Sequence, residues 1–335
     1  MSVMRSLVLG AVAMLALACT AKTTIDADSS EIDTRKRDFR AYPALLDLRD
    51  DDLYVLSDPH GGLIALTELL RANGLVDRAP VELEDAKNVR WTAGTSTLIV
   101  VGDLIDKGPD SLGVIDFLRE LQTQAPRVGG RVVVTMGNHE AEFLVDAKND
   151  KATSNDKNLI GIDHQLDDLE IDPESISAGR DPEGRGLWLR NLPLGIRNKK
   201  WFFAHAGDTG GRNFRDLALH LEDEIRKHGF ESDAVLGKNS LLESEQWFGD
   251  EDDGKARDYA AELDVEHIVF GHDPNAFGDR DKIEMSKDRS LLKINVEMGL
   301  PTSGKSRGGL LLHVDTKGTD HADVLDARGN RKRLF

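Results

Sequence analysis

The 335-residue chain contains a single cysteine, Cys19, which excludes an intramolecular disulfide and a zinc site built on cysteine thiolates. Positive charge is also scarce, because 43 Lys and Arg face 60 Asp and Glu and leave a net charge of −17. A surface of that sign opposes general binding to nucleic acid or to anionic lipid. The length is sufficient for one large domain whose core needs no covalent staple.

The first 18 residues have the pattern of a secretory signal peptide. A short basic segment, Met1 to Arg5, precedes the apolar stretch Leu7 to Ala18, which is too short to cross a bilayer as a helix. Small residues at its end offer a cleavage site. The sequence therefore predicts an exported protein.

Cys19 directly follows this stretch, and Leu15 to Cys19 resembles a bacterial lipobox. The resemblance implies a lipidated Cys19 that makes the membrane contact, with Thr20 favouring the outer membrane and a periplasmic or surface-facing domain. The alternative is ordinary signal cleavage, which leaves a soluble periplasmic or secreted protein with a free thiol. Residues 19–37 are polar and lack periodic apolar positions, so they are interpreted as a disordered tether.

Three short runs of β-branched and leucine residues each end in polar residues. The runs Leu53 to Leu56, Thr97 to Val101 and Val132 to Val134 read as buried strands. The polar residues that follow them include Asp58, His60, Asp103, Asp106, Asn138 and His139. Because ligands gather at the carboxyl ends of strands in open α/β sheets, these side chains are expected at one rim.

Helical periodicity fills the segments between the runs. Leu63 to Asn73 predicts one helix, and Ser111 is interpreted as the N-cap of a second, whose apolar face includes Leu112 and Leu121. This β-α-β order implies parallel strands. Further along, strands are expected at 201–204 and 268–270, helices at 214–228 and 256–263, and a closing antiparallel pair at 291–296 and 309–314.

The order D-x-H, G-D-x-x-D and G-N-H-E, at Asp58, Asp103 and Gly137, resembles the calcineurin-like metallophosphoesterase superfamily. The stretch Gly102 to Ser111 is similar to its phosphoprotein-phosphatase branch, and Trp188 to Leu194 to the Shewanella-like phosphatases and diadenosine tetraphosphatases. The resemblance implies an α/β fold, a β-sandwich of two mixed sheets flanked by helices. The expected catalytic domain covers 38–330, with cap insertions at about 142–190 and 208–262.

The same resemblance implies a pair of divalent metal ions. Asp58, His60 and Asp103 would bind the first ion. The second ion would be bound by Asp103, Asn138, His205 and His272, so both ions would share Asp103. Oxygen and imidazole ligands without sulfur suit Mn²⁺, Fe²⁺/³⁺ or Zn²⁺ and do not separate them. Two such ions lower the pKa of a water between them and hold the phosphoryl oxygens during in-line displacement.

Four residues would act on the substrate by the same resemblance. His139 would protonate the leaving group with Asp106 as its partner, while Lys107 and Asn138 would bind the phosphate. Lys107 stands where the protein phosphatases carry an arginine, so the bidentate fork is lost. The second phosphate-binding arginine, sought near Leu241 to Phe248, has no match; Arg180, Arg185, Arg190 and Arg212 are the candidates to replace it.

The resulting prediction is a metal-dependent phosphomonoesterase, a serine/threonine- or tyrosine-type protein phosphatase, whose partner is a phosphorylated substrate. A dinucleoside polyphosphate hydrolase is the first alternative, although such enzymes end the third motif in Asp where this chain has Glu140. An inactive, lipid-anchored scaffold is the alternative of another class. The intact ligand set and the Asp106 and His139 pair oppose that reading. The oligomeric state stays open.

Overall fold

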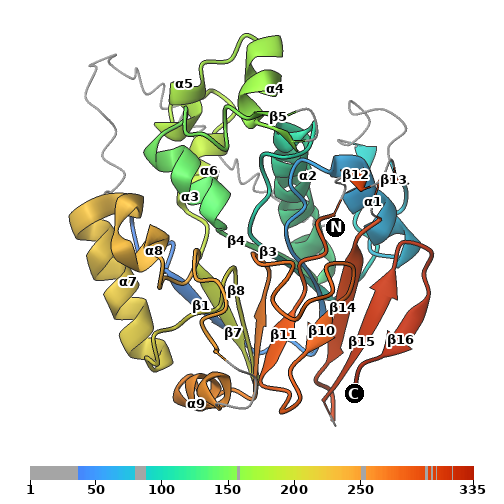
Figure 1. Cartoon of the computed structure of the whole chain (residues 1–335). Helices are drawn as coiled ribbons and strands as arrows, with labels where there is room; N and C mark the ends of the chain where they lie inside the picture. The colour runs from blue at the N-terminus through green and yellow to red at the C-terminus, as the bar shows by residue number, and fades with distance from the viewer. Residues whose placement is uncertain are drawn as a thin grey trace, which may run out of the picture. The chain divides into compact units, whose positions relative to one another are not determined.

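Runs of branched and leucine side chains form the strands of two six-stranded mixed sheets (Figure 1). The computed structural model describes residues 37–79, 88–156, 159–249, 254–298, 301–302, 305–306, 308–318 and 320–335. The predicted signal peptide, Cys19 and all of the tether except Arg37 lie outside these residues. The strand pairings confirm the expected sandwich of two mixed sheets flanked by helices.

One sheet is built around the three predicted parallel strands. Its order is β16-β15-β14-β2-β3-β4, with β2 parallel to β3 and β3 parallel to β4, which confirms the β-α-β interpretation. Strand β14 pairs antiparallel with both β2 and β15. The bounds are β2 Asp52–Leu56, β3 Thr97–Val101, β4 Arg131–Thr135, β14 Leu310–Asp315, β15 His321–Asp326 and β16 Arg331–Arg333.

The second sheet has the order β1-β7-β8-β9-β11-β10, with β8 parallel to β9 and β9 parallel to β11. Its bounds are β1 Leu45–Leu48, β7 Gly195–Asn198, β8 Trp201–Ala204, β9 His267–Phe270, β10 Glu284–Met285 and β11 Leu291–Lys293. Side chains such as Val101, Ile99 and Phe203 fill the space between the two sheets and are fully buried. Both sheets contribute to this core, whereas the edge strand β16 is exposed.

The predicted closing pair is wrong. Strand β11, within 291–296, joins β9 in one sheet, whereas β14, within 309–314, joins β2 and β15 in the other. The two apolar runs read alike because both are buried, and apolar composition does not specify the partner strand. Strands β15 and β16 supply the antiparallel closure instead, beyond the predicted segment.

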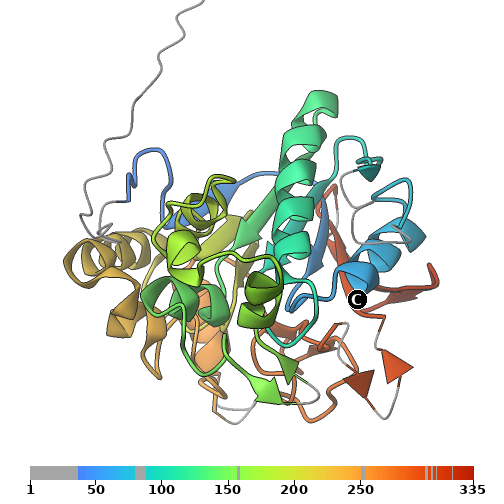
Figure 2. The ribbon, with the colours of Figure 1, turned by 90° about the horizontal axis from the view of Figure 1, so that it is seen from above.

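Helices cover the outer faces of the sandwich. Figure 2 shows α1 and α2 on the side away from α7. The bounds are α1 Leu63–Ala72, α2 Ser111–Gln124, α7 Phe214–His228 and α9 Lys255–Glu262, close to the predicted segments.

The N-cap of α2 is Asp110 and not Ser111 as predicted, because Asp110 Oδ1 accepts a hydrogen bond from the Gly113 N–H at 3.0 Å. The Ser111 hydroxyl instead accepts the Asp106 N–H.

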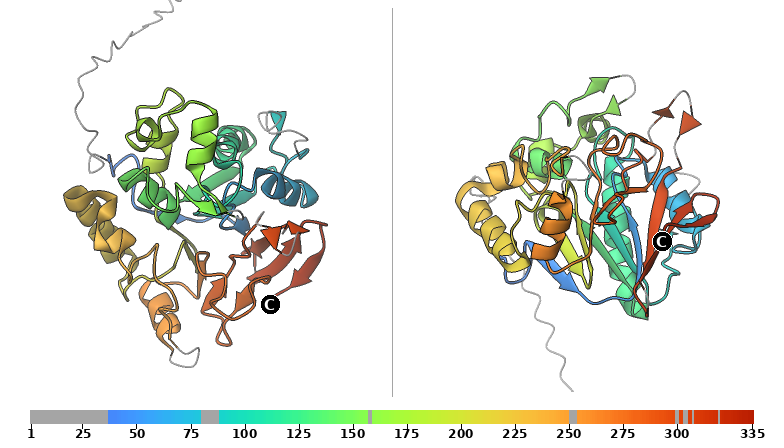
Figure 3. Two further views of the ribbon diagram at one scale, coloured as in Figure 1. Left: turned by 45° about the horizontal axis from the view of Figure 1, so that its top comes forward. Right: turned by 60° about the horizontal axis from the view of Figure 1, so that its bottom comes forward.

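Short helices lie over one end of the sandwich. They are α3 Asn138–Val145, α4 Ile162–Asp168, α5 Pro173–Ser177, α6 Arg185–Arg190 and α8 Asp233–Leu236 (Figure 1). Figure 3 shows two small hairpins, β5–β6 (Asn155–Asp156 and Leu159–Ile160) and β12–β13 (Pro301–Thr302 and Lys305–Ser306), at the same end. No helix within the described ranges has the length and apolar character needed to cross a membrane.

The ends of the described domain differ slightly from the predicted bounds. Arg37, placed in the tether by sequence, is buried, and its guanidinium donates to five backbone carbonyl groups, including those of Tyr42 and Leu192. At the other end, Phe335 stacks on Trp201 with ring centroids 6.0 Å apart. The packed unit therefore extends from Arg37 to Phe335.

Candidate metal centre

Five strands deliver the predicted ligands to one edge of the sandwich. Strands β2, β3 and β4 end at the D-x-H, G-D-x-x-D and G-N-H-E motifs, and β8 and β9 end at His205 and His272. Backbone hydrogen bonds join these loops: the N–H of His60 donates to Asp103 O at 2.9 Å, and the N–H of Gly271 donates to His205 O at 2.8 Å. The loops therefore hold one another in place before any side chain is considered.

The backbone of these loops is unusual. Non-glycine residues with positive φ are uncommon, and they cluster at functional sites where surrounding structure over-determines them. Within the described ranges, twelve non-glycine residues have positive φ. Six of them are predicted site residues: Asp58, His60, Asp103, Asp106, Lys107 and His272. Half of the left-handed backbone outside glycine is thus concentrated at this edge.

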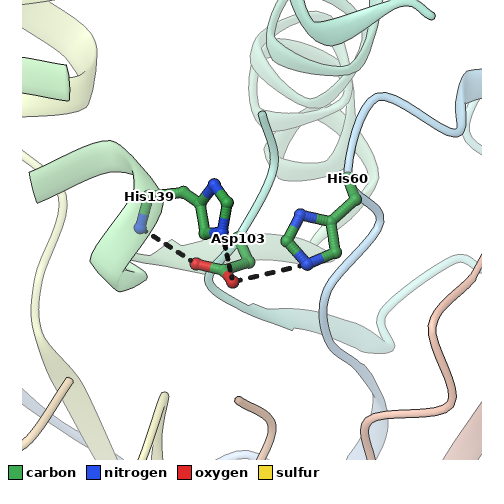
Figure 4. A group of neighbouring side chains, drawn as sticks. All are labelled: His60, Asp103 and His139. Atoms are coloured by element: carbon green, nitrogen blue, oxygen red, sulfur yellow. Dashed lines mark hydrogen bonds and ion pairs between the residues drawn. The ribbon is translucent and has the colours of Figure 1, made fainter. Parts of the chain in front are cut away.

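Asp103 lies at the middle of the cluster (Figure 4). Its Oδ2 is 3.4 Å from His60 Nε2 and 3.8 Å from His139 Nε2, while its Oδ1 is 3.2 Å from His205 Nε2. Two groups of potential metal ligands exist within the described residues, and both include Asp103: His60, Asp103 and His139, and Asp58, Asp103 and His205. The two carboxylate oxygens therefore face different sets of side chains.

Asn138 and His272 complete the second side of the cluster. The Asn138 Oδ1 lies 3.0 Å from His205 Nε2, and the rings of His205 and His272 meet edge to face with centroids 5.1 Å apart. His272 belongs to neither of the two three-residue groups, although it lines the adjacent cavity. All six predicted ligands are thus brought to one edge.

Two of the histidines are held with the same ring nitrogen inward. His60 Nδ1 lies 3.0 Å from Ile105 O, and His205 Nδ1 lies 3.1 Å from Val101 O. Because a carbonyl oxygen only accepts, each Nδ1 carries a proton and each Nε2 faces Asp103. Metal-ligating histidines are commonly oriented by such a hydrogen bond on the other nitrogen.

Asp58 gives the strongest evidence that the cluster suits a cation. Its side chain is fully buried, and its Oδ2 has no hydrogen bond of acceptable geometry within the described part of the chain. Its Oδ1 accepts from Asn295 Nδ2 at 2.9 Å. A Cβ at Gly271 would lie 2.3 Å from Asp58 Oδ2, so only glycine allows the β9 loop this close. Burial of a carboxylate that has one oxygen without a partner is costly unless a positive charge compensates it.

The pKa shifts of the buried groups fit a site that binds positive charge. Burial raises the pKa of Asp58 to about 7. Burial also lowers the pKa of His60 well below its ordinary value, which leaves the ring neutral, and lowers that of His272 to about 4. Burial opposes protonation of His205, but the Asp103 charge and hydrogen bond outweigh it and raise the pKa to about 9. Bound cations would supply that charge, so the residues present fit a metal pair.

His139 and Asp106 form a separate pair beside the cluster. His139 Nδ1 lies 2.7 Å from Asp106 Oδ2, and both side chains are buried. Asp106 Oδ1 accepts the Ile162 N–H at 3.0 Å, which fixes the carboxylate. The pairing directs His139 Nε2 toward the Asp103 side of the cluster, as Figure 4 shows.

Glu140 is a structural residue of the site to which the sequence assigned no role. Its buried carboxylate accepts four backbone N–H groups, from Asp103, Leu104, Ile105 and Gly137, at 2.7 to 3.2 Å. It therefore joins the β3 and β4 loops. A Cβ at Gly137 would lie 2.2 Å from Asp103 Oδ1, so glycine is required there too. Its place as the last residue of the G-N-H-E motif was the sequence signal that could have pointed to Glu140.

A cavity of about 490 Å³ opens beside the cluster and contains the predicted substrate-binding residues. Lys107 Nζ lies 2.8 Å from His60 Nε2. Lys151 and Arg280 also line the cavity. None of the four candidate arginines lines it: Arg185 pairs with Asp116, and Arg190 donates to Ser177 O. Arg280, which pairs with Glu297, was missed because its loop follows β9 at a distance from every motif.

The comparisons with known proteins agree with this geometry. The family model of the calcineurin-like phosphoesterases matches residues 52–276. A Shewanella-like protein phosphatase of Arabidopsis thaliana is 33% identical over 92 residues, 28% of this chain and 21% of that protein. A symmetrical bis(5'-nucleosyl)-tetraphosphatase of an Enterobacter strain is 30% identical over 158 residues, 47% of this chain and 43% of that protein. The chain thus spans less than half of either relative.

A solved structure resembles the whole fold. The cold-active protein-tyrosine phosphatase of a psychrophilic Shewanella superposes with a TM-score of 0.65 at 21% identity, covering 88% of this chain and 82% of that one. At this identity the likeness concerns the arrangement of strands and helices. It agrees with the two mixed sheets described above.

Proposed function

The chain belongs to the calcineurin-like phosphoesterase family, and from that premise we propose that it hydrolyses phosphate monoesters, with phosphoproteins as substrates. Membership makes the chain a metal-dependent phosphoric ester hydrolase. The observation that carries the proposal is the position of Asp103, whose two oxygens face two separate groups of potential ligands. One carboxylate can bridge two cations in this way.

Six residues would hold the cation pair. Asp58, His60 and Asp103 would bind one ion, and Asp103, Asn138, His205 and His272 would bind the other. When bound, two divalent cations activate a water molecule and neutralise the phosphoryl oxygens. The buried, unpaired Asp58 Oδ2 supports this assignment.

His139 would supply the proton that the leaving group needs. Water attacks phosphorus, the bond between phosphorus and the ester oxygen breaks, and the proton on His139 Nε2 passes to that oxygen. Asp106 keeps the proton donor oriented through Nδ1, 2.7 Å away.

Lys107 and Asn138 would bind the phosphate. The Lys107 ammonium now lies on the lone pair of His60 Nε2, which a cation would also need, so the two cannot share it. Lys107 lines the cavity and can turn to a phosphate oxygen there. A lysine contributes one charge without a bidentate fork, so the phosphate is held less rigidly than by arginine.

Hydrolysis of dinucleoside polyphosphates is the second candidate, favoured by the likeness to the bacterial tetraphosphatase. Glu140 in place of the Asp of those enzymes supports the phosphatase instead. Turnover of p-nitrophenyl phosphate, a phosphoserine peptide, a phosphotyrosine peptide and diadenosine tetraphosphate by the Mn²⁺-loaded protein separates the two. Preference for a phosphopeptide is expected; preference for the dinucleotide by tenfold or more would reverse the assignment. Bound metal without turnover would indicate a scaffold.

We also propose that the protein is exported and lipidated at Cys19, a residue outside the described ranges. Metabolic labelling with a palmitate analogue tests this directly. The wild-type chain should incorporate label and fractionate with outer membranes. Cys19→Ser should do neither, and an unlabelled wild-type chain in the soluble periplasmic fraction would favour ordinary signal cleavage.

A further inference from the structure

Asn138 has a ligand role that depends on which way its amide faces. Only the oxygen can bind a cation, and rotation of the amide by half a turn would place the NH₂ group there instead. In the structure Oδ1 faces His205, and Nδ2 donates to Glu243 Oε1 at 2.7 Å. A carboxylate only accepts hydrogen bonds, so the rotated amide would bring two oxygens together. We propose that Glu243 is a positioning residue that keeps the Asn138 oxygen on the second cation, an inference that rests on the proposed function.

The Glu243 carboxylate is itself fixed from a second direction. Lys151 Nζ lies 3.5 Å from the same Oε1 and donates to Glu142 Oε1 at 2.5 Å. Glu142 follows Asn138 by one turn of α3, so both ends of this chain of contacts return to one helix. Oε1 of Glu243 thus accepts from Asn138 and faces the Lys151 ammonium.

The loop that carries Glu243 is anchored to the loop of another cation ligand. The Ala206 N–H donates to Leu241 O at 2.9 Å, and Ser244 Oγ donates to Asp208 Oδ2 at 2.9 Å. Ser240 Oγ accepts the Glu243 N–H at 3.1 Å. Glu243 therefore keeps a set position relative to His205, the residue that the Asn138 oxygen faces.

The arrangement also accounts for every hydrogen-bonding group of the Asn138 amide. The oxygen faces the cation site and Nδ2 donates to Glu243, while a second N–H on Nδ2 would bind a phosphate oxygen in the cavity that Asn138 lines. Glu243 lies in the segment Leu241 to Phe248, where the second phosphate-binding arginine was sought and has no match.

Three variants of the full chain test the role, with Mn²⁺ binding measured by calorimetry and by the metal content of the purified protein. Glu243→Leu should weaken binding of the second Mn²⁺ by about 10- to 100-fold, as loss of an orienting partner does. It should also raise KM, because the Asn138 N–H that would bind the phosphate is misplaced. Glu243→Gln keeps an acceptor oxygen, which Lys151 holds in the same direction, and should bind Mn²⁺ nearly as wild type. Glu245→Leu removes the same charge from the same cavity without touching Asn138 and should also bind normally.

A second background separates orientation from folding. Asn138→Asp has two equivalent oxygens and nothing to orient, and Glu243 repels it. Adding Glu243→Leu should therefore strengthen Mn²⁺ binding there, opposite to its effect on the wild type. Equal weakening in both backgrounds, normal Mn²⁺ binding by Glu243→Leu, or equal weakening by Glu243→Gln would each overturn the proposal. A wild-type chain that binds no Mn²⁺ pair would instead refute the proposed function.

Discussion

Replacement of Glu140 by glutamine tests how the rigid frame of the centre is built. The wild-type carboxylate accepts four N–H groups, two on each oxygen. Glutamine keeps the shape and one oxygen, but its NH₂ group must face two N–H donors. Burial raises the pKa of Glu140 to about 7, so the carboxylate is ionised above that pH. Hydrogen bonds to charged groups contribute about 1.5–3 kcal/mol each, so loss of two predicts a destabilisation of about 3–6 kcal/mol above that pH.

Urea unfolding of the protein freed of metal by a chelator, monitored by tryptophan fluorescence, measures this change in the free energy of unfolding. Glu68→Gln on the exposed face of α1 is the matched control and should stay within about 0.5 kcal/mol of wild type. The spread of the β3 and β4 loops should also weaken Mn²⁺ binding by Glu140→Gln. If Glu140→Gln were as stable as Glu68→Gln, the account of Glu140 as the link between the two loops would be refuted.

Three further results are expected. His139→Asn should slow hydrolysis of a phosphoserine peptide by at least about 100-fold. It should slow hydrolysis of p-nitrophenyl phosphate less, because p-nitrophenolate is a better leaving group. Metal content should not change, and unchanged turnover would remove His139 from the mechanism. Lys107→Ala should raise KM for phosphopeptides while Lys107→Arg restores it, and equal KM values would exclude a phosphate contact. Burial opposes protonation of His205, but the Asp103 charge and hydrogen bond outweigh it and raise the pKa of His205 to about 9. Below pH 9 a cation must therefore displace a proton from His205. Mn²⁺ affinity, measured by calorimetry, should therefore rise by up to about tenfold per pH unit from pH 6 to 8, and a flat profile would contradict the protonated state.

Strong local patterns made much of the fold predictable. The run Thr97 to Val101 is a strand with those bounds because it is a continuous apolar run that stops at Gly102. Phe214 to His228 is a helix with those bounds because its apolar residues recur at helical spacing and Gly229 follows. The candidate ligands were predictable for the same reason, since each follows the end of a predicted strand. The residue types and the order of the motifs along the chain then placed them on one edge.

Features set by distant contacts were not predictable. Asp110 and Ser111 are adjacent residues that can both cap a helix, and only the hydrogen bond to Gly113 decides between them. Asn295 and Glu243 touch the centre from loops that no motif marks. The strands at 291–293 and 310–315 enter different sheets because pairing is chosen by the whole sandwich.

The central claim is that one carboxylate, Asp103, is shared by two cations. The most direct measurement is a crystal structure of the Mn²⁺-loaded protein with anomalous diffraction at the manganese edge, compared with the metal content of wild type and Asp103→Asn. Two anomalous peaks on opposite oxygens of Asp103, and a loss of metal in Asp103→Asn, are predicted. A single peak, or peaks that leave Asp103 uncoordinated, would contradict the account.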